Sequence, residues 1–134
     1  MNHLDHVAFA VLDLDQSIDF YEKNFGFKLE YREKLESQGV ELAFLALSNT
    51  KIELLAALDE ESVLNKFLKK RGPGLHHVCY RVDNINYELS RLRHSGFKLI
   101  DTEPRPGAHN TLIAFIHPES TGGVLTELCE YQAI

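Results

Sequence analysis

The stretch LDHVAFAV, from Leu4 to Val11, decides the fold because a close copy of it, LHHVCYRV, returns from Leu75 to Val82. Each copy is a short run rich in apolar and β-branched or aromatic residues, which is typical of a strand. Self-similarity between distant parts of one chain is the sequence signature of a repeated structural unit. We therefore predict that the chain contains two copies of one unit, each beginning with a strand.

A helix is predicted after each of these strands. In the first copy Asp13 or Asp15 can cap a segment whose apolar residues recur at steps of three and four, and in the second copy Asn84 precedes the same spacing. Gly26 and Gly96 then stop the helices, since glycine accepts the positive φ that a helix end requires. The same tripeptide, FKL, follows each glycine.

Three further strands are predicted in each copy, at residues 28–34, 40–47 and 51–57 and at residues 98–102, 110–116 and 124–130. The unit is therefore βαβββ, present twice, in an α+β fold. A sheet that one helix covers still needs a partner for its other face, which the second copy supplies. We predict one domain over residues 1–134, with the first repeat at 1–58, a connecting helix within 59–73 and the second repeat at 74–134.

The composition is that of an ordinary globular chain, with 134 residues of which 44% are hydrophobic and 25% charged. No apolar run approaches the ~20 residues that span a bilayer, and the N-terminus lacks the pattern of a signal peptide. We therefore expect a cytoplasmic protein without a membrane partner. The formal net charge of -6 argues against a nucleic-acid partner.

Two local patterns favour structural roles. Cys79 and Cys129 both lie within apolar runs rather than in a C-x-x-C arrangement, so we expect buried, reduced thiols and no disulfide. The basic cluster near residues 66–71 is typical of a solvated helix end that complements the helix dipole, although it could also meet an anionic ligand.

The repeat also pairs two histidines. His6 in the first strand aligns with His77, whereas the neighbouring His76 aligns with Asp5. Because side chains alternate between the faces of a strand, His6 and His77 lie on equivalent faces and His76 points to the other face.

The last strand of each copy supplies a second pair, since KIELL (51–55) matches LTELC (125–129) and places Glu53 opposite Glu127 in the alignment. A carboxylate in an apolar strand is costly to bury unless it is paired or binds a metal. Two imidazoles and two carboxylates that converge on a shared cup would suit Zn²⁺, Co²⁺, Mn²⁺ or Ni²⁺, with positions left open for water or substrate. The pattern therefore predicts a catalytic metal site.

Six segments in order resemble the vicinal oxygen chelate superfamily: LDHV (4–7), SQGV (37–40), TKIELL (50–55), GLHH (74–77), EPRPGA (103–108), and HP (117–118) followed by TGGVL (121–125). That superfamily contains glyoxalase I, extradiol dioxygenases, fosfomycin-resistance proteins and methylmalonyl-CoA epimerases. The resemblance covers nearly the whole chain, and among these members it is strongest to the epimerases. It implies paired βαβββ units around one divalent metal.

The resemblance also implies an activity. It places the family's metal ligands on His6, Glu53, His77 and Glu127, the same four residues that the duplication pairs. It implies interconversion of (2R)- and (2S)-methylmalonyl-CoA through an enolate, with Co²⁺ or Mn²⁺ as the metal and Zn²⁺ or Ni²⁺ as alternatives. Glu127 is then both a ligand and a catalytic base, the partner is an acyl-CoA substrate, and the assembly is a homodimer. The alternatives are glyoxalase I (lactoylglutathione lyase) and a metal-free binding module of the bleomycin-resistance type.

One position departs from this pattern. Some epimerases carry a glutamate, resembling a second base, four residues after the glutamine of the QGV segment, whereas this chain has Leu42 there and Glu41 one residue earlier. By strand alternation Glu41 faces the other way. Four sources of the second base therefore stay open: Glu41 re-aimed by a bulge, Glu53, a metal-bound water, or a single base that serves both proton transfers.

Overall fold

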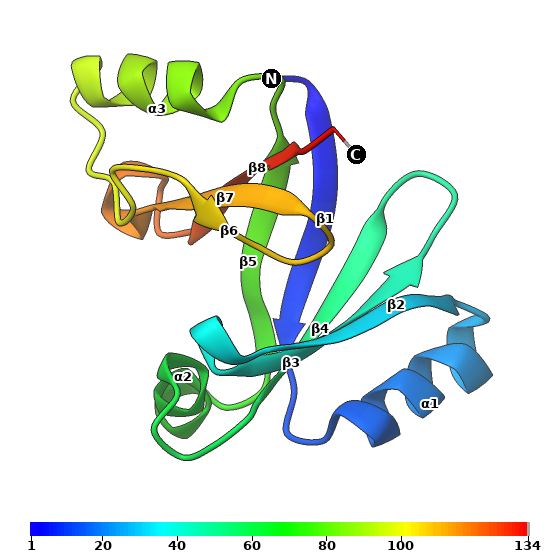
Figure 1. Ribbon diagram of the computed structural model, residues 1–134. Helices are drawn as coiled ribbons and strands as arrows, with labels where there is room; N and C mark the ends of the chain where they lie inside the picture. The colour runs from blue at the N-terminus through cyan, green and yellow to red at the C-terminus, as the bar shows by residue number, and fades with distance from the viewer. Residues whose placement is uncertain (134) are drawn as a thin grey trace. The chain divides into compact units, whose positions relative to one another are not determined.

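Two units make up the chain in the computed structural model, which describes residues 1–133. The N-terminal unit is His6–His76, and the C-terminal unit combines Met1–Asp5 with the chain from His77 onward. Figure 1 shows that each unit contains a sheet and at least one helix.

The N-terminal unit contains a four-stranded sheet in the order β2-β3-β4-β1. Strand β4 pairs in parallel with β1 and antiparallel with β3, and β3 pairs antiparallel with β2. Its elements are β1 (His3–Ala10), α1 (Leu14–Phe25), β2 (Lys28–Leu35), the 3₁₀ turn η1 (Glu36–Gln38), β3 (Val40–Ala46), β4 (Lys51–Ala57) and α2 (Val63–Arg71).

The C-terminal unit repeats this connectivity, with the order β5-β8-β7-β6. Strand β8 pairs in parallel with β5 and antiparallel with β7. Its elements are β5 (Gly74–Arg81), α3 (Ile85–His94), β6 (Arg105–Pro106), β7 (Thr111–Ile116), the 3₁₀ turn η2 (Pro118–Ser120) and β8 (Thr126–Tyr131). The predicted α+β fold with two βαβββ units is therefore confirmed.

Both predicted helices begin and end as their sequences indicate. Of the two candidate caps, Asp13 caps α1, because its side chain accepts a hydrogen bond of 2.9 Å from the backbone N–H of Gln16. Asn84 caps α3 in the same way, accepting from Tyr87 at 3.0 Å. After α1 the chain turns at Gly26, whose φ of 70° lies in the left-handed region that favours glycine.

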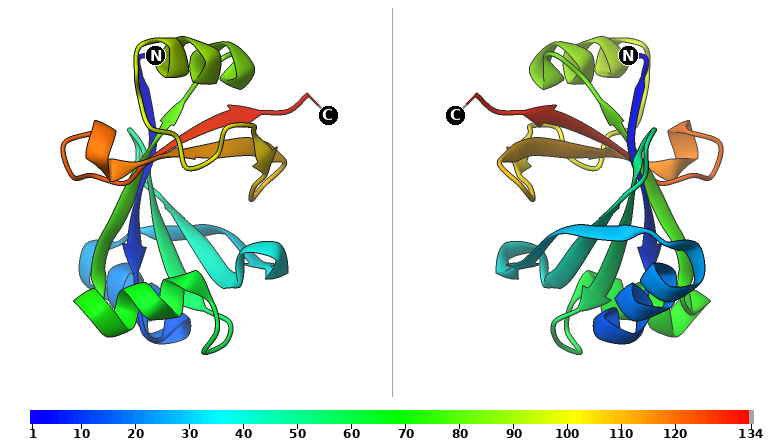
Figure 2. Two further views of the ribbon diagram at one scale, coloured as in Figure 1. Left: turned by 90° about the vertical axis from the view of Figure 1, so that its left-hand side faces the viewer. Right: turned by 90° about the vertical axis from the view of Figure 1, so that its right-hand side faces the viewer.

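The strand predicted at residues 98–102 is wrong. This part of the chain makes an isolated bridge from Leu99 to Ile116 and a few backbone hydrogen bonds with Phe115 and His117, and the paired edge strand β6 is two residues long. In Figure 2 the yellow segment between α3 and β7 is mostly irregular chain. The Asp101 carboxylate accepts a 2.8 Å hydrogen bond from the backbone N–H of Phe115, and the Phe115 carbonyl accepts from the backbone N–H groups of Ile100 and Asp101, so irregular contacts replace a regular ladder here. Pro106 also lacks the N–H that a longer ladder would need.

Each sheet has one face that a helix covers. Residues of α1 pack with alternate residues of β3 and β4, and the buried cluster consists of Leu14, Ile18, Ala43, Leu45, Leu54 and Ala56. Residues of α3 form the equivalent cluster with β7 and β8, which consists of Val82, Ile85, Leu89, Leu92, Ala114, Ile116 and Leu128. The alternate residues of the same strands therefore lie on the face away from the helix.

Both cysteines are free and buried, as the sequence predicts. Burial raises the pKa of the Cys79 thiol well above its ordinary value, and a hydrogen bond with Cys129 acts in the same direction.

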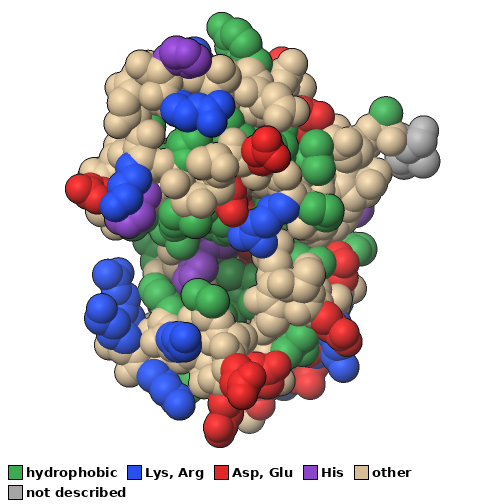
Figure 3. Space-filling model, turned by 60° about the vertical axis from the view of Figure 1, so that its left-hand side comes forward, with side chains coloured by type: hydrophobic (Ala, Val, Ile, Leu, Met, Phe, Trp, Pro, Cys, Tyr) green, Lys and Arg blue, Asp and Glu red, His purple; other side chains and the backbone are tan. Residues whose placement is uncertain are grey.

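The basic residues at the end of α2 are solvated. Lys66, Lys69, Lys70 and Arg71 are all exposed, and blue side chains gather over this helix in the space-filling view (Figure 3). Within residues 1–133 no helix is long and apolar enough to cross a membrane.

Candidate functional site

The first half of the candidate site lies on β1 and β4. His6 and Glu53 are each only 5% exposed, and the His6 Nε2 atom lies 3.2 Å from the Glu53 Oε1 atom. The strand register brings them together, because Ala8, two residues after His6, is the direct partner of Glu53 in the parallel β1–β4 ladder. Residues two apart share a face, so both side chains emerge on the same side of the sheet.

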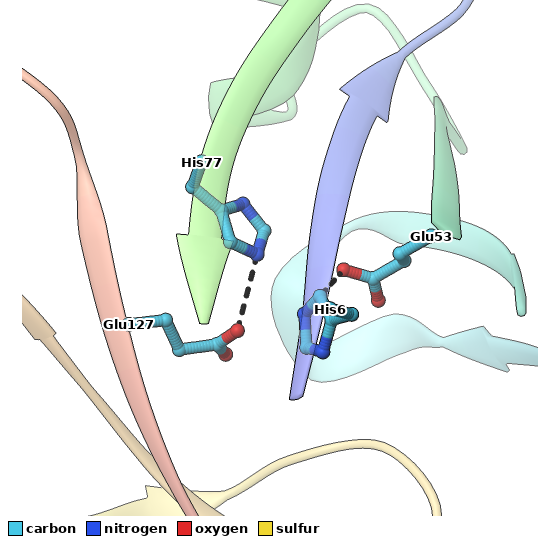
Figure 4. Close-up of side chains that lie close together, drawn as sticks. All are labelled: His6, Glu53, His77 and Glu127. Carbon is cyan, nitrogen blue, oxygen red and sulfur yellow. Dashed lines mark ion pairs between the residues drawn. The ribbon is translucent and has the colours of Figure 1, made fainter. Parts of the chain in front are cut away.

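The second half repeats this geometry on β5 and β8. The His77 Nε2 atom lies 3.1 Å from the Glu127 Oε1 atom, and both side chains are buried. Cys79, two residues after His77, is the direct partner of Glu127, as Ala8 is of Glu53. Figure 4 shows the two ion pairs as dashed lines. The alignment of the repeats therefore corresponds to identical strand registers in the two units.

A phenylalanine completes each half. Phe44 is the direct partner of Glu53 in the antiparallel β3–β4 ladder, and Phe115 is the partner of Glu127 in the β7–β8 ladder. The ring of Phe44 meets His6 edge-on at 5.2 Å, and that of Phe115 meets His77 edge-on at 5.3 Å. Such packing fixes the plane of an imidazole ring. We call His6, Phe44 and Glu53 the first half-site, and His77, Phe115 and Glu127 the second half-site.

A basic side chain lies against each phenylalanine. The Lys51 Nζ atom is 5.1 Å from the centre of the Phe44 ring, and the Arg105 guanidinium carbon is 5.8 Å from the centre of the Phe115 ring. These distances are typical of cation–π contacts. Each half-site therefore has a positive charge beside it.

The two adjacent histidines of β5 have different surroundings. His77 pairs with Glu127, whereas the ring of His76 packs edge-on against Phe67 of α2 at 4.7 Å between ring centres. The sequence prediction that His76 points to the other face is therefore confirmed.

Glu41 lies on the helix-covered side of β3. Its carboxylate accepts a 3.1 Å hydrogen bond from Arg32, which also forms an ion pair with Asp15 of α1. The β2–β3 and β3–β4 registers run without a shift through Glu41, and the irregularity in β2 lies between Leu29 and Tyr31. No bulge re-aims Glu41, and the position on the half-site face is Leu42, which is 1% exposed.

In chemical terms each half-site offers one imidazole nitrogen and one carboxylate oxygen. Such donors bind first-row divalent metals, and a carboxylate can also accept a proton from a substrate. The sequence prediction named both members of each pair but missed Phe44 and Phe115. The signal that could have found them is their position directly across the ladder from each glutamate.

Comparison with known proteins identifies relatives over almost the whole chain. Residues 5–115 match the family model of the Glyoxalase/Bleomycin resistance protein/Dioxygenase superfamily. An ethylmalonyl-CoA/methylmalonyl-CoA epimerase of Cereibacter sphaeroides is 38% identical over 96% of this chain and 97% of its own.

Solved structures give the same result. A methylmalonyl-CoA epimerase from Mycobacterium tuberculosis has a TM-score of 0.93 and 44% identity, over 98% of this chain and 89% of its own. A methylmalonyl-CoA epimerase in complex with methylmalonyl-CoA and NH4+ has a TM-score of 0.92 and 33% identity, over 98% and 96% of the two chains.

Proposed function

The chain belongs to the Glyoxalase/Bleomycin resistance protein/Dioxygenase superfamily, and on that premise we propose that it is an epimerase that interconverts (2R)- and (2S)-methylmalonyl-CoA. The observation that carries this proposal is the presence of two buried histidine–glutamate pairs at equivalent strand registers. Relatives that cover nearly the whole chain and carry the name of this activity support it.

We propose that His6, Glu53, His77 and Glu127 together hold one divalent metal ion. The chemistry of the donors supports this assignment, because all four side chains are buried and each carboxylate already lies beside an imidazole. A set of two nitrogens and two oxygens suits Co²⁺ or Mn²⁺, with Zn²⁺ or Ni²⁺ as alternatives. A cation bound there would act as a Lewis acid on the negative charge that develops at the thioester oxygen.

The residues of the chain would carry out the proton transfer. Carbon 2 of methylmalonyl-CoA lies beside the thioester carbonyl, so its proton is removed with the electron pair delocalised onto oxygen as an enolate. We propose that the Glu127 carboxylate takes this proton as a general base. Return of a proton to the opposite face of the enolate gives the other epimer. Lys51 and Arg105 beside the half-sites supply positive charge that suits an anionic acyl group.

The position of Glu41 narrows the choice of a second base. Because Arg32 binds Glu41 on the helix side and no bulge re-aims it, we exclude Glu41 from this role. Glu53, a water molecule or a single shared base would then deliver the second proton transfer. Of these, Glu53 is the carboxylate in the first half-site, so we propose it as the first to test.

Deuterium wash-in at carbon 2 of methylmalonyl-CoA in ²H₂O tests the function. We expect exchange with the holoprotein, loss of exchange after EDTA treatment, and recovery with Co²⁺ or Mn²⁺, since ligands alone cannot replace the metal. Full exchange in a verified metal-free sample would contradict the metal-assisted mechanism. Methylglyoxal with glutathione is the control substrate, and formation of lactoylglutathione at a comparable rate would favour glyoxalase I instead.

The location and the assembly state stay predictions from the sequence. We propose that the protein is a cytoplasmic homodimer. Size-exclusion chromatography with light scattering would test the oligomeric state.

A further inference from the structure

A second group of metal-binding residue types lies within the C-terminal unit. Asp5, Cys79 and Cys129 each offer one ligand atom, and these three atoms all lie within 4.8 Å of one another. All three side chains are buried, and Asp5, the most exposed of them, is 5% exposed. We call these three residues the thiol cluster.

The strand register creates this cluster. Cys79 on β5 is the direct partner of Glu127, and Cys129 lies two residues further along β8, where its direct partner is Arg81. The two thiols therefore share one face of the sheet at diagonal positions. Ile113 packs with them in a buried apolar cluster, and the partly buried ring of Tyr131 lies against it.

The diagonal placement suits a bridging metal ion better than a disulfide. Neighbouring strands lie ~4.8 Å apart and two residues rise ~6.6 Å, so the two Cα atoms are separated by about 8 Å. A disulfide usually requires a separation of about 4.4–6.8 Å. A tetrahedral ion about 2.3 Å from each sulfur holds the two sulfurs on the order of 4 Å apart. This value is compatible with the ligand atoms of the thiol cluster, which lie within 4.8 Å of one another.

A hydrogen bond orients the third group. The Tyr131 hydroxyl donates a 2.8 Å hydrogen bond to the Asp5 Oδ1 atom. Partners of this kind hold a carboxylate ligand in one orientation and are typical of metal sites. The guanidinium of Arg81 lies 4.4 Å from the centre of the Tyr131 ring, and this cation–π contact helps to hold the ring whose hydroxyl binds Asp5.

We propose that Asp5, Cys79 and Cys129 form a second metal site, which takes a soft divalent ion such as Zn²⁺ and is separate from the imidazole and carboxylate donors of the half-sites. Thiolate ligands select soft ions, whereas the half-sites offer nitrogen and oxygen. On binding, two S–H bonds break, two sulfur–metal bonds form and two protons pass to solvent, with no change of oxidation state. The site does not depend on the proposed epimerase activity.

Titration with Cd²⁺ alone tests this site, because a sulfur–cadmium bond gives an ultraviolet charge-transfer band that nitrogen and oxygen ligands do not. We expect wild-type protein, reduced and free of added thiols, to develop the band with a stoichiometry of one ion per chain. The matched control is His6→Ala with His77→Ala, which removes imidazoles from both half-sites and keeps both cysteines. The band should persist there, so this result is independent of any loss of epimerase activity.

Two variants sharpen the assignment. Cys79→Ala with Cys129→Ala should abolish the band, and Asp5→Asn should weaken Cd²⁺ binding at least ~10-fold, since a charged ligand becomes neutral. Unchanged affinity in Asp5→Asn would remove Asp5 from the site. Absence of the band in wild-type protein at saturating Cd²⁺ would overturn the proposal even if no variant folds. A loss of both free thiols in metal-free, air-exposed protein would point to a disulfide and would overturn it as well.

Discussion

The two units carry the same half-site on sheets whose other positions differ. In the C-terminal unit Cys79 and Cys129 lie beside the second half-site, and their equivalents in the N-terminal unit are Ala8 and Leu55. The register of the histidine, the glutamate and the phenylalanine opposite it is the same in both units, although other residues on the same face differ. The two units thus share the register and the phenylalanine contact of the histidine–glutamate pair, whereas the positions of the cysteines on that face vary.

The edges of the two sheets also differ. The N-terminal unit has an eight-residue edge strand, β2, whereas the edge strand β6 of the C-terminal unit has two residues. There the Asp101 carboxylate binds the backbone N–H of Phe115, the residue that packs against His77. An irregular segment that contributes a side-chain acceptor and two backbone donors therefore supports the half-site strand here, whereas a full edge strand supports it in the other unit.

The largest effect is expected when the histidine of either half-site is replaced by alanine, and the loss of Co²⁺ affinity tests whether the two half-sites contribute equally to metal binding. His6→Ala and His77→Ala should each weaken Co²⁺ binding more than ~10²-fold, because mutating even an outer-shell partner of a metal ligand costs 10- to 100-fold. Isothermal titration with Co²⁺ measures the affinity. His76→Ala is the matched control and should keep its affinity, because His76 packs against Phe67. Equal losses in all three variants would refute the assigned register, and a loss in only one of His6→Ala and His77→Ala would show unequal half-sites.

A smaller effect is expected when each glutamate is replaced by glutamine, and comparing the turnover of the two variants tests which half-site supplies the base. Glu127→Gln keeps an oxygen that can coordinate but removes the carboxylate that accepts a proton, so turnover should fall at least ~10²-fold at saturating metal. Glu53→Gln also keeps an oxygen that can coordinate, and it should cost less because we propose Glu127, not Glu53, as the base for the first proton transfer. The measurement is a metal titration beside an epimerisation assay on the same preparation.

The control for this pair is Glu41→Gln, which should keep its turnover because Arg32 holds Glu41 on the helix side. Turnover near the wild-type value in Glu127→Gln would show that Glu127 is only a ligand. A larger loss in Glu53→Gln than in Glu127→Gln would assign the base to the first half-site.

The sequence was sufficient for the parts of the site that lie on well-aligned strands. The pairs His6–His77 and Glu53–Glu127 follow from the first and last strands of each copy, where the alignment has no gap. Phe44 and Phe115 were missed because the loops between them and the glutamates differ in length, with Glu53 nine residues after Phe44 and Glu127 twelve after Phe115. An alignment loses its register across such a difference, whereas ladder pairing does not.

The wrong strand at residues 98–102 has a different cause. It begins within the FKL that both copies share, and the repeat therefore predicts an edge strand there, as in the first copy. In the structure the Asp101 side chain accepts a hydrogen bond from Phe115, fourteen residues away, where a strand ladder would use a backbone carbonyl. Local patterns do not contain such contacts. The repeat boundaries proposed from the sequence also stay a prediction, because β1 and β5 each begin in one unit and continue into the other.

The smallest expected effect tests whether the two units also rely equally on their helix caps. Asp13→Ala and Asn84→Ala should each lower the free energy of unfolding by about 1 kcal/mol, because the backbone N–H groups of Gln16 and Tyr87 lose their side-chain acceptors. Urea denaturation measures the change. Asp13→Ser and Asn84→Ser are the matched controls, since serine keeps an oxygen that can cap and should cost only a few tenths of a kcal/mol. Equal losses would extend the likeness of the two units from the half-sites to the helices that cover the opposite faces. A loss for Asp13→Ala alone would instead show that α3, whose N-terminal Ile85 N–H also donates to Glu130 at 2.9 Å, is held chiefly by that contact.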